Sequence, residues 1–177
     1  MRVIKQLISI LIFTATNLSA AFAAPSEDFD YQIHVSLWTT HFNPKPEHNN
    51  DQNLTGFEFY GDRLPPSRYQ RYRGISDYAR PLAGVAWFRN SFGQKSLYAY
   101  GGVRQNFVRY GEVQTYGKLT AGLIHGYRGE YKDKIPFNQL GIAPAVLPML
   151  GAQYQNSFAE LTLFGVSGVM LTVGLNF

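Results

Sequence analysis

His41 and Ser91 are the residues of this chain whose types could together perform nucleophilic chemistry. His41 lies near the end of Leu37–Phe42, and Ser91 directly follows Trp87–Asn90. A serine hydroxyl becomes a useful nucleophile only beside a base such as imidazole, and a third group usually fixes the imidazole tautomer. The two residues are far apart in the sequence, so such chemistry requires a fold that joins them. Otherwise both are polar groups at strand ends.

The elements that would position them are segments in which apolar and polar residues alternate. The clearest is Met170–Phe177, where the apolar members are Leu171, Val173, Leu175 and Phe177. A period of two is that of a strand with one apolar face. A phenylalanine at the very end is typical of the closing strand of an outer-membrane β-barrel.

Eight such segments follow one another along the chain after residue 24. They predict an all-β fold, an eight-stranded antiparallel transmembrane β-barrel of the outer-membrane type spanning residues 25–177. Closure is expected because lipid cannot satisfy a bare strand edge. The alternative is a soluble, lipocalin-like barrel. The expected strands are residues 31–42, 54–61, 82–90, 96–107, 117–130, 143–155, 158–165 and 169–177.

Residues 1–24 have the pattern of a secretory signal peptide. Arg2 and Lys5 precede the apolar run Leu7–Phe13, and a small-residue stretch ends at Ala24. The alternative is a buried amphipathic helix. We therefore expect export and a location in the bacterial outer membrane.

Composition excludes several classes of function. Removing Arg2 and Lys5 with the signal lowers the formal charge from +4 to +2, so the basic balance is no evidence for nucleic-acid binding. The chain has no cysteine, which excludes disulfides and thiolate chemistry.

The expected topology places His41 and Ser91 at one rim of the barrel. If both termini are periplasmic, the loops near residues 43–53 and 91–95 face the exterior. Strict alternation puts His41 on the lipid-facing side with Ile33 and Val35, and puts Trp38 inside. A histidine at the boundary of bilayer and water favours an enzyme acting on lipid head groups over one acting on a soluble substrate.

At these residues the chain resembles the lipid A palmitoyltransferases (PagP). Members of that family are eight-stranded outer-membrane barrels that move a palmitoyl chain from phospholipid to lipid A. The likeness covers most of the mature chain and is densest from residue 82 onward. It rests on Trp38 through His41, Phe88–Phe92, Ile135–Pro136, Pro144–Pro148 and the aromatic end at Phe177.

The resemblance implies a catalytic set of His41 as general base, Ser91 as its hydroxyl partner and Asn90 as an orienting amide. The family has an aspartate where this chain has Asn90, and its histidine directly follows a tryptophan, whereas His41 lies three residues after Trp38. The family's amino-terminal amphipathic helix has no counterpart in Pro25–Asp30.

The implied function is an outer-membrane enzyme that transfers an acyl chain to, or removes one from, lipid A or phospholipid. Its partners would be lipid A, as part of lipopolysaccharide, and phospholipid. We expect no cofactor, no nucleic-acid partner and a monomer. The alternative is a non-enzymatic small barrel that serves as an adhesin, a permeability factor or a stabiliser of the envelope. A small-solute channel is less favoured, since eight strands leave little lumen.

Pro144 and Pro148 have a physical meaning of their own. Proline has no backbone donor, so two in one strand either open a slot in the barrel wall or mark a bulge at the rim. In the resembling family such a slot admits the acyl chain. Trp38, Phe88 and Met170 would then line an acyl pocket, although aromatic filling of a small barrel predicts the same residues.

Two further histidines and one basic segment also lead to predictions. His48 lies in a polar loop without the ordered spacing of a metal site, so no metal is expected. The alternative is a place where divalent ions bridge lipopolysaccharide phosphates. His34, in mid-strand with inward parity, is interpreted as a hydrogen-bonding group of the lumen. The basic segment 62–81 contacts lipid head groups or is a solvated loop.

Overall fold

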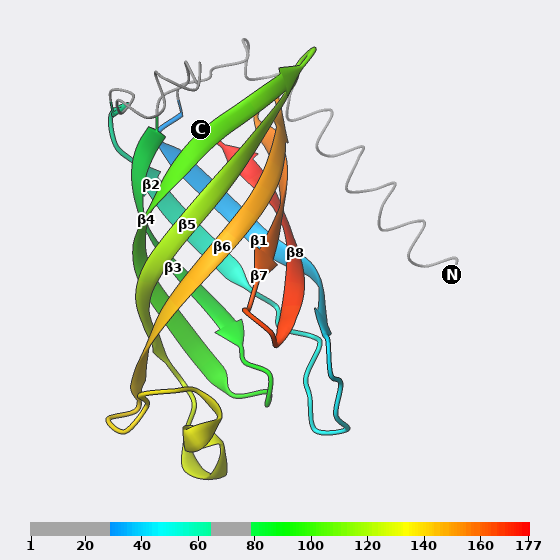
Figure 1. Ribbon diagram of the computed structural model, residues 1–177, viewed down its shortest axis with the longest axis vertical. Helices are drawn as coiled ribbons and strands as arrows, with labels where there is room; N and C mark the ends of the chain where they lie inside the picture. Colours follow the sequence, from blue (N-terminus) through cyan, green and yellow to red (C-terminus); the bar gives the residue numbers. More distant parts are fainter. Residues whose placement is uncertain (1–28, 65–78) are drawn as a thin grey trace, which may run out of the picture.

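The computed structural model describes residues 29–64 and 79–177, whose strands close into one barrel (Figure 1). Each strand pairs antiparallel with the next, and β8 returns to β1, which confirms the expected eight-stranded antiparallel barrel. The elements are β1 (Tyr31–His41), β2 (Thr55–Tyr60), β3 (Ala79–Arg89), β4 (Lys95–Tyr110), β5 (Val113–His125), the 3-10 helix η1 (Gly129–Lys134), β6 (Ile142–Tyr154), β7 (Ser157–Leu163) and β8 (Gly168–Asn176).

Some of the sequence predictions concern other parts of the chain. The signal peptide expected at residues 1–24, and residues 65–78 of the basic segment, lie outside the described residues. Within the described part, no helix is long and apolar enough to cross a membrane.

Alternation along the strands decides which side chains face inward. Many large apolar side chains stand on the outer surface, whereas the lumen holds polar side chains together with an apolar and aromatic cluster that includes Leu82, Tyr98 and Met170. The barrel therefore has an apolar exterior and an interior that is polar in one part and apolar in another. The exposed apolar side chains include Ile33, Val35, Phe59, Leu119, Leu123, Val146, Leu150 and Leu161.

The seam between β1 and β8 closes the barrel as expected from the terminal strand. Its register runs from Gln32 opposite Asn176 to His41 opposite Gly168. Beyond it, the Phe177 N–H donates to the Tyr31 carbonyl at 2.9 Å. A Cβ at position 168 would lie 2.3 Å from the Thr40 carbonyl oxygen, so only glycine allows this close approach.

A β-bulge in β1 changes which of its residues face the lumen. The register with β8 shifts between Ser36 and Trp38, so Leu37 is the extra residue. Trp38 is therefore 52% exposed on the outer surface, whereas His41 points inward and is 9% exposed. The predictions that Trp38 lies inside and His41 on the outer side were both wrong, because one inserted residue inverts the alternation beyond it.

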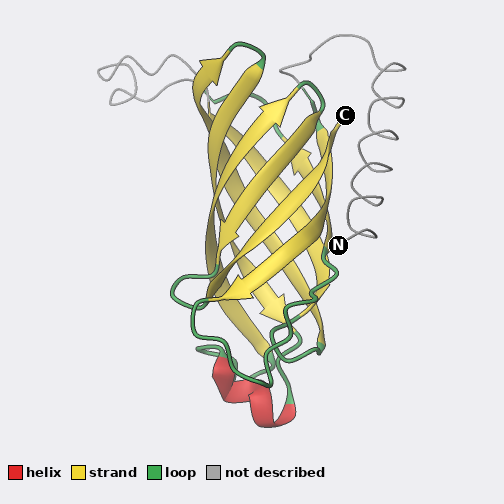
Figure 2. Ribbon diagram, turned by 90° about the vertical axis from the view of Figure 1, so that its right-hand side faces the viewer, coloured by secondary structure: helices red, strands yellow, loops and turns green. Residues whose placement is uncertain are grey.

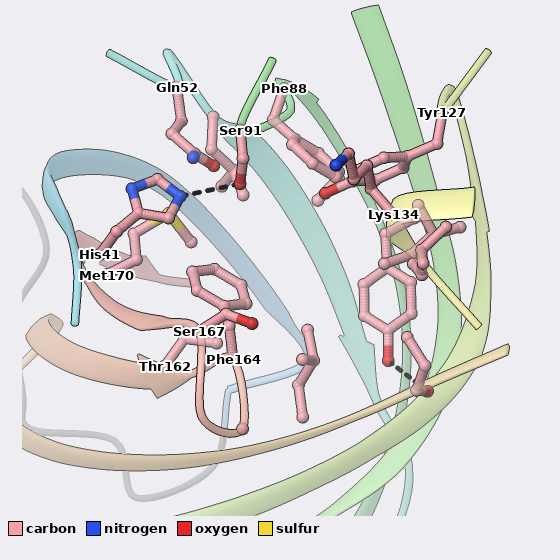
Figure 3. Close-up of a pocket in the computed structure, with 18 of the residues that line it drawn as sticks. His41, Gln52, Phe88, Ser91, Tyr127, Lys134, Thr162, Phe164, Ser167 and Met170 are labelled. Carbon is pink, nitrogen blue, oxygen red and sulfur yellow. Dashed lines mark hydrogen bonds between the residues drawn. The ribbon is translucent and has the colours of Figure 1, made fainter. Parts of the chain in front are cut away.

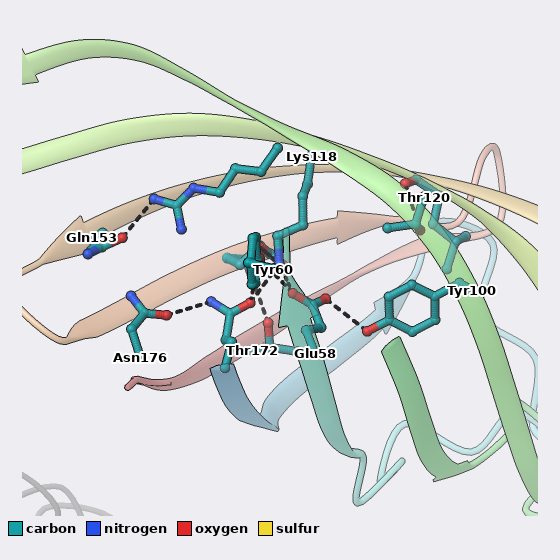
Figure 4. Close-up of polar contacts among 12 residues, drawn as sticks. Glu58, Tyr60, Tyr100, Lys118, Thr120, Gln153, Thr172 and Asn176 are labelled. Carbon is teal, nitrogen blue, oxygen red and sulfur yellow. Dashed lines mark hydrogen bonds and ion pairs between the residues drawn. The ribbon is translucent and has the colours of Figure 1, made fainter. Parts of the chain in front are cut away.

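A cluster of buried polar side chains, here called the polar layer, crosses the lumen (Figure 4). At its centre the Lys118 Nζ atom lies 2.8 Å from a carboxylate oxygen of Glu58 and 2.8 Å from one of Glu160. The hydroxyls of Tyr60 and Tyr100 donate to Glu58 at 2.6 and 2.8 Å. Because these charges are paired and hydrogen-bonded, the lumen tolerates them away from water.

The polar layer and the loops occupy different levels of the barrel. The carboxy-terminus lies at one end and η1 at the other (Figure 2). On the side of the carboxy-terminus, Arg104 stacks 3.7 Å over the Tyr116 ring and donates to Gln153 at 2.7 Å. A cavity lies on the other side, toward η1 and the loops.

Candidate active site

His41 and Ser91 meet at the end of the barrel that carries η1. The His41 Nε2 atom lies 2.9 Å from the Ser91 Oγ atom, within hydrogen-bonding distance (Figure 3). His41 is the last residue of β1, and Ser91 follows the end of β3. The contact expected from the sequence is confirmed. The bulge in β1 makes it possible, because it turns the imidazole toward the lumen.

The third group of the arrangement is Asn50, which sequence reasoning missed. Its Oδ1 atom lies 2.7 Å from the His41 Nδ1 atom. An amide oxygen only accepts, so Nδ1 carries the imidazole proton and Nε2 is left to accept from the Ser91 hydroxyl. This is the tautomer that a general base requires.

The path of the loop 42–54 explains how Asn50 reaches His41. The Asn49 N–H donates to the Ser91 carbonyl, and the Arg89 N–H donates to the Gln52 carbonyl, each at 2.7 Å. The loop therefore runs as an extra partner along the end of β3. The spacing of residues 43–53 in the sequence does not predict that this loop pairs with β3.

Asn90 has a structural role here, so the prediction that it orients His41 was wrong. Its Oδ1 atom accepts from the backbone N–H groups of Phe92 and Gln94 at 3.0 and 3.1 Å. The side chain is completely buried. Asparagine commonly caps a turn in this way, and the capped turn holds Ser91 in place without Asn90 touching the imidazole.

Tyr127 faces Ser91 from the loop after β5. Burial raises the pKa of its hydroxyl, and the contacts with the Ser91 side chain and backbone oppose that rise only in part. The hydroxyl therefore stays protonated at neutral pH and can donate a hydrogen bond close to Ser91.

His48 packs on the open face of His41. The two ring centroids are 4.3 Å apart, and Phe92 meets the His48 ring edge-on at 5.7 Å. The Nδ1 atom of His48 is buried and has no hydrogen-bond partner among the described residues. Burial, then His41, then the cations Lys45 and Lys134 lower the pKa of His48, while Glu47 acts in the opposite direction. A neutral His48 places no second charge beside His41.

The titration of His48 can be followed directly. We expect the Cε1–H resonance of His48 to titrate with a midpoint below pH 6.5, the ordinary value for histidine. Because a positive neighbour disfavours the imidazolium, Lys45→Gln should move this midpoint upward. A midpoint at or above pH 6.5 in the unmodified protein would contradict the stacked, partly desolvated position of the ring.

Behind the dyad lies a cavity of about 690 Å³. Its walls are mostly apolar, and its far end reaches His34, Tyr100 and Glu160 beside the polar layer. His34 lies seven residues before His41 on β1, roughly 20 Å along the strand. The cavity is therefore deep, with its reactive groups at the mouth. The apolar wall includes Leu54, Phe88, Ile124, Leu147, Phe164 and Met170.

The residues predicted to form a pocket divide into two groups. Phe88, Met170 and Pro144 line the cavity, whereas Trp38 and Pro148 do not. Trp38 is displaced to the outer surface by the bulge. Pro148 points outward, since it has the parity of the exposed residues of β6.

The two prolines lie where β6 has no partner on one side. The ladder between β6 and β7 ends at Met149 opposite Thr162, so the stretch Ile142–Pro148 pairs only with β5. No register shift accompanies the prolines, which makes the bulge interpretation wrong for β6. Val146 faces outward, is 61% exposed and still lines the cavity. The cavity therefore reaches the outer surface through the wall here.

A second interruption lies beside His41 and was not predicted. The ladder between β1 and β2 ends at Val35 opposite Thr55. Two further hydrogen bonds join Ser36 and Leu54: the Ser36 N–H donates to the Leu54 carbonyl, and the Leu54 N–H donates to the Ser36 hydroxyl oxygen. The stretch 37–41 of β1 pairs only with β8. The wall is thus interrupted on two sides of the cavity mouth.

Comparisons with known proteins do not assign the chain to a family. No protein-family model matches the chain, and the search of curated proteins likewise finds no match.

Within the described residues, no group of three or more histidine, cysteine or acidic side chains could hold a metal ion.

Proposed function

We propose that this protein is an outer-membrane enzyme that transfers an acyl chain to, or removes one from, lipid A or phospholipid. The observation that carries the proposal is the His41–Ser91 pair at the mouth of a deep, mostly apolar cavity that opens through the barrel wall. A cavity of this shape suits an acyl chain, with the ester at the mouth beside the hydroxyl. The resemblance to the palmitoyltransferases points to the same chemistry.

The proposed reaction begins with proton transfer from the Ser91 hydroxyl to His41 Nε2. The Ser91 oxygen then attacks the ester carbonyl, and a C–O bond forms as the carbonyl oxygen becomes an oxyanion. Collapse of this intermediate breaks the ester bond, and the imidazolium returns its proton to the departing lipid alcohol. The acyl chain then passes from Ser91 to a hydroxyl of the acceptor, or to water, by the same steps in reverse order.

Two further groups support this chemistry. Asn50 holds the His41 tautomer by accepting from Nδ1. The protonated Tyr127 hydroxyl beside Ser91 can donate to the oxyanion as it forms.

A membrane location is supported by the exposed apolar side chains around the outer surface. In a bilayer, the unpaired stretch of β6 would let a lipid chain enter from the side, without leaving the hydrocarbon phase. The interruption between β1 and β2 offers a second route through the barrel wall. The donor lipid and the acceptor lipid could therefore enter by different routes.

Cross-linking can test the route at β6. Continuing the register beyond Met149 and Thr162 places Pro148 opposite Leu163, both on the outer surface. In Pro148→Cys/Leu163→Cys, joining the two thiols with a disulfide or a short bismaleimide should lower the rate of transfer at least about tenfold, since it closes the base of the opening. Reducing the disulfide should restore the rate. The chain has no native cysteine to interfere.

The matched control is Leu150→Cys/Leu161→Cys. These residues face outward in the intact ladder, two register positions from Pro148 and Leu163. Cross-linking this pair should leave the rate unchanged. Equal rates for both cross-linked proteins would show that lipid does not pass at β6.

Mass spectrometry of membrane lipids tests the function itself. Lipid A and phospholipids are compared in cells without the protein, with it and with Ser91→Ala. We expect one lipid species to gain or lose an acyl mass only with the unmodified protein. Identical lipids in all three samples would reject the enzyme and favour the adhesin, permeability or envelope-stabilising role.

A further inference from the structure

The cavity mouth carries two lysine side chains that the proposed reaction does not use. Lys45 comes from the loop after β1, and Lys134 ends η1 in the loop between β5 and β6. Both line the cavity, and Figure 3 shows Lys134 among the cavity residues beside Tyr127. Within residues 29–64 and 79–177, neither ammonium group has a hydrogen-bond or ion-pair partner.

The two lysines come from opposite loops but act on the same place. Each lowers the pKa of His48, whose ring packs at a tilt against His41. Both lysines line the same cavity as His41 and Ser91, so the two ammonium groups and the His41–Ser91 pair share one opening. Two unpaired cations that converge on one opening favour an anionic group there.

One acidic side chain opposes them. Glu47 also lines the mouth, two residues after Lys45, so the three side chains together carry one positive charge. Glu47 acts in addition on Tyr131, which places its charge toward the β5–β6 loop. Its presence supplies a test of sign, because its removal should strengthen the binding of an anion.

We infer that Lys45 and Lys134 form a phosphate subsite that holds the phosphorylated head group of the lipid whose ester lies at Ser91. This subsite rests on the proposed function and names the chemistry of its substrate: a lipid bearing a phosphate near the ester. An ammonium group serves as a compact point charge for phosphate, without the bidentate geometry of arginine. The phosphate could belong to lipid A or to a phospholipid, and the two can be separated by experiment.

Binding is measured in detergent with Ser91→Ala as the background, so that no turnover occurs. The probes are lipid A with and without its phosphates, and a short-chain phosphatidylglycerol beside the matching diacylglycerol. Lys45→Gln and Lys134→Gln should each weaken binding of a phosphorylated probe about fivefold, given roughly 1 kcal/mol for a lysine facing an anionic lipid surface. Binding of the phosphate-free probes should not change. The effect should shrink at high salt.

Two control variants sharpen the result. Lys132→Gln removes the same charge from η1, but Lys132 does not line the cavity, so binding should stay within twofold. Glu47→Gln should strengthen binding of the phosphorylated probe. If the affinity for the phosphorylated probe depends only on total charge and not on the position of the substitution, the subsite is rejected and a general surface field explains the binding.

The outcomes separate the subsite from the enzyme. Phosphorylated lipid A responding while phosphatidylglycerol does not, or the reverse, identifies the source of the phosphate. If phosphorylated lipid binds both lysine variants as tightly as the unmodified background, the subsite is rejected, but the proposed acyl cavity is not. Failure of every lipid to bind overturns the subsite together with the proposed function.

Discussion

Replacing His41 with alanine should lower the rate of acyl transfer by about three orders of magnitude or more, as expected when a general base of a serine nucleophile is lost. Ser91→Ala should have an effect of similar size. Since the two side chains act on one proton, the double variant should be little slower than either single one. The assay follows release of the lipid alcohol and appearance of the acylated acceptor.

Asn50 and Asn90 provide the matched controls for this prediction. Asn50→Leu should lower the rate by roughly ten- to a hundredfold, because it removes the acceptor that fixes the His41 tautomer. Asn50→Asp keeps an oxygen at that position and should retain most of the rate. Asn90→Asp keeps the acceptor for the turn and should also remain active. Activity that survives in both His41→Ala and Ser91→Ala would reject the assigned pair.

Replacing Lys118 with methionine should lower the free energy of unfolding by about 3–5 kcal/mol, the range for breaking a buried ion pair by removing one partner. Lys118 is fully buried between Glu58 and Glu160. Its loss leaves two carboxylates close together in the lumen without a cation. Urea unfolding in detergent or lipid vesicles, followed by far-ultraviolet circular dichroism, measures the change.

A compensated variant distinguishes unpaired charge from lost packing. Lys118→Met/Glu58→Gln/Glu160→Gln removes the cation and both carboxylates, so it should recover most of the lost stability. A triple variant no more stable than Lys118→Met would show that the shape of the lysine, and not its charge, is what the lumen requires. Lys132→Gln outside the lumen should change stability by less than about 0.5 kcal/mol.

The barrel could be predicted because its determinants are local and repeated. The strand sequences alternate with a period of two, and the barrel closes once β8 is recognised as the partner of β1. The meeting of His41 and Ser91 was predicted for the same reason, since both end strands at one rim.

The inner and outer sides at that rim could not be predicted, because a bulge has no reliable sequence signal. One extra residue, Leu37, reverses the facing of everything after it in β1. The assignment of Asn90 failed for a different reason. A residue at a matching family position can take the family's role only if the local turn leaves its side chain free. Here the Asn90 amide oxygen already accepts two backbone hydrogen bonds of the turn, and its amide group donates to Gln94 and Gly126.

Asn50 was missed because its approach depends on how a long loop pairs with β3, which is a non-local contact. The polar layer did have a signal. Glu58, Lys118 and Glu160 are charged residues within three expected strands. Charged side chains inside membrane-spanning strands must pair with one another in the lumen.

The polar layer also gives the barrel a direction. The far end of the cavity lies beside these paired charges, so in the proposed function an acyl chain entering beside η1 would meet them and would leave on the side by which it came. In an outer-membrane enzyme of the proposed kind, lipid exchange would then be confined to a single leaflet. The same ion pairs that we expect to stabilise the fold would then help to preserve the asymmetry of the two membrane faces.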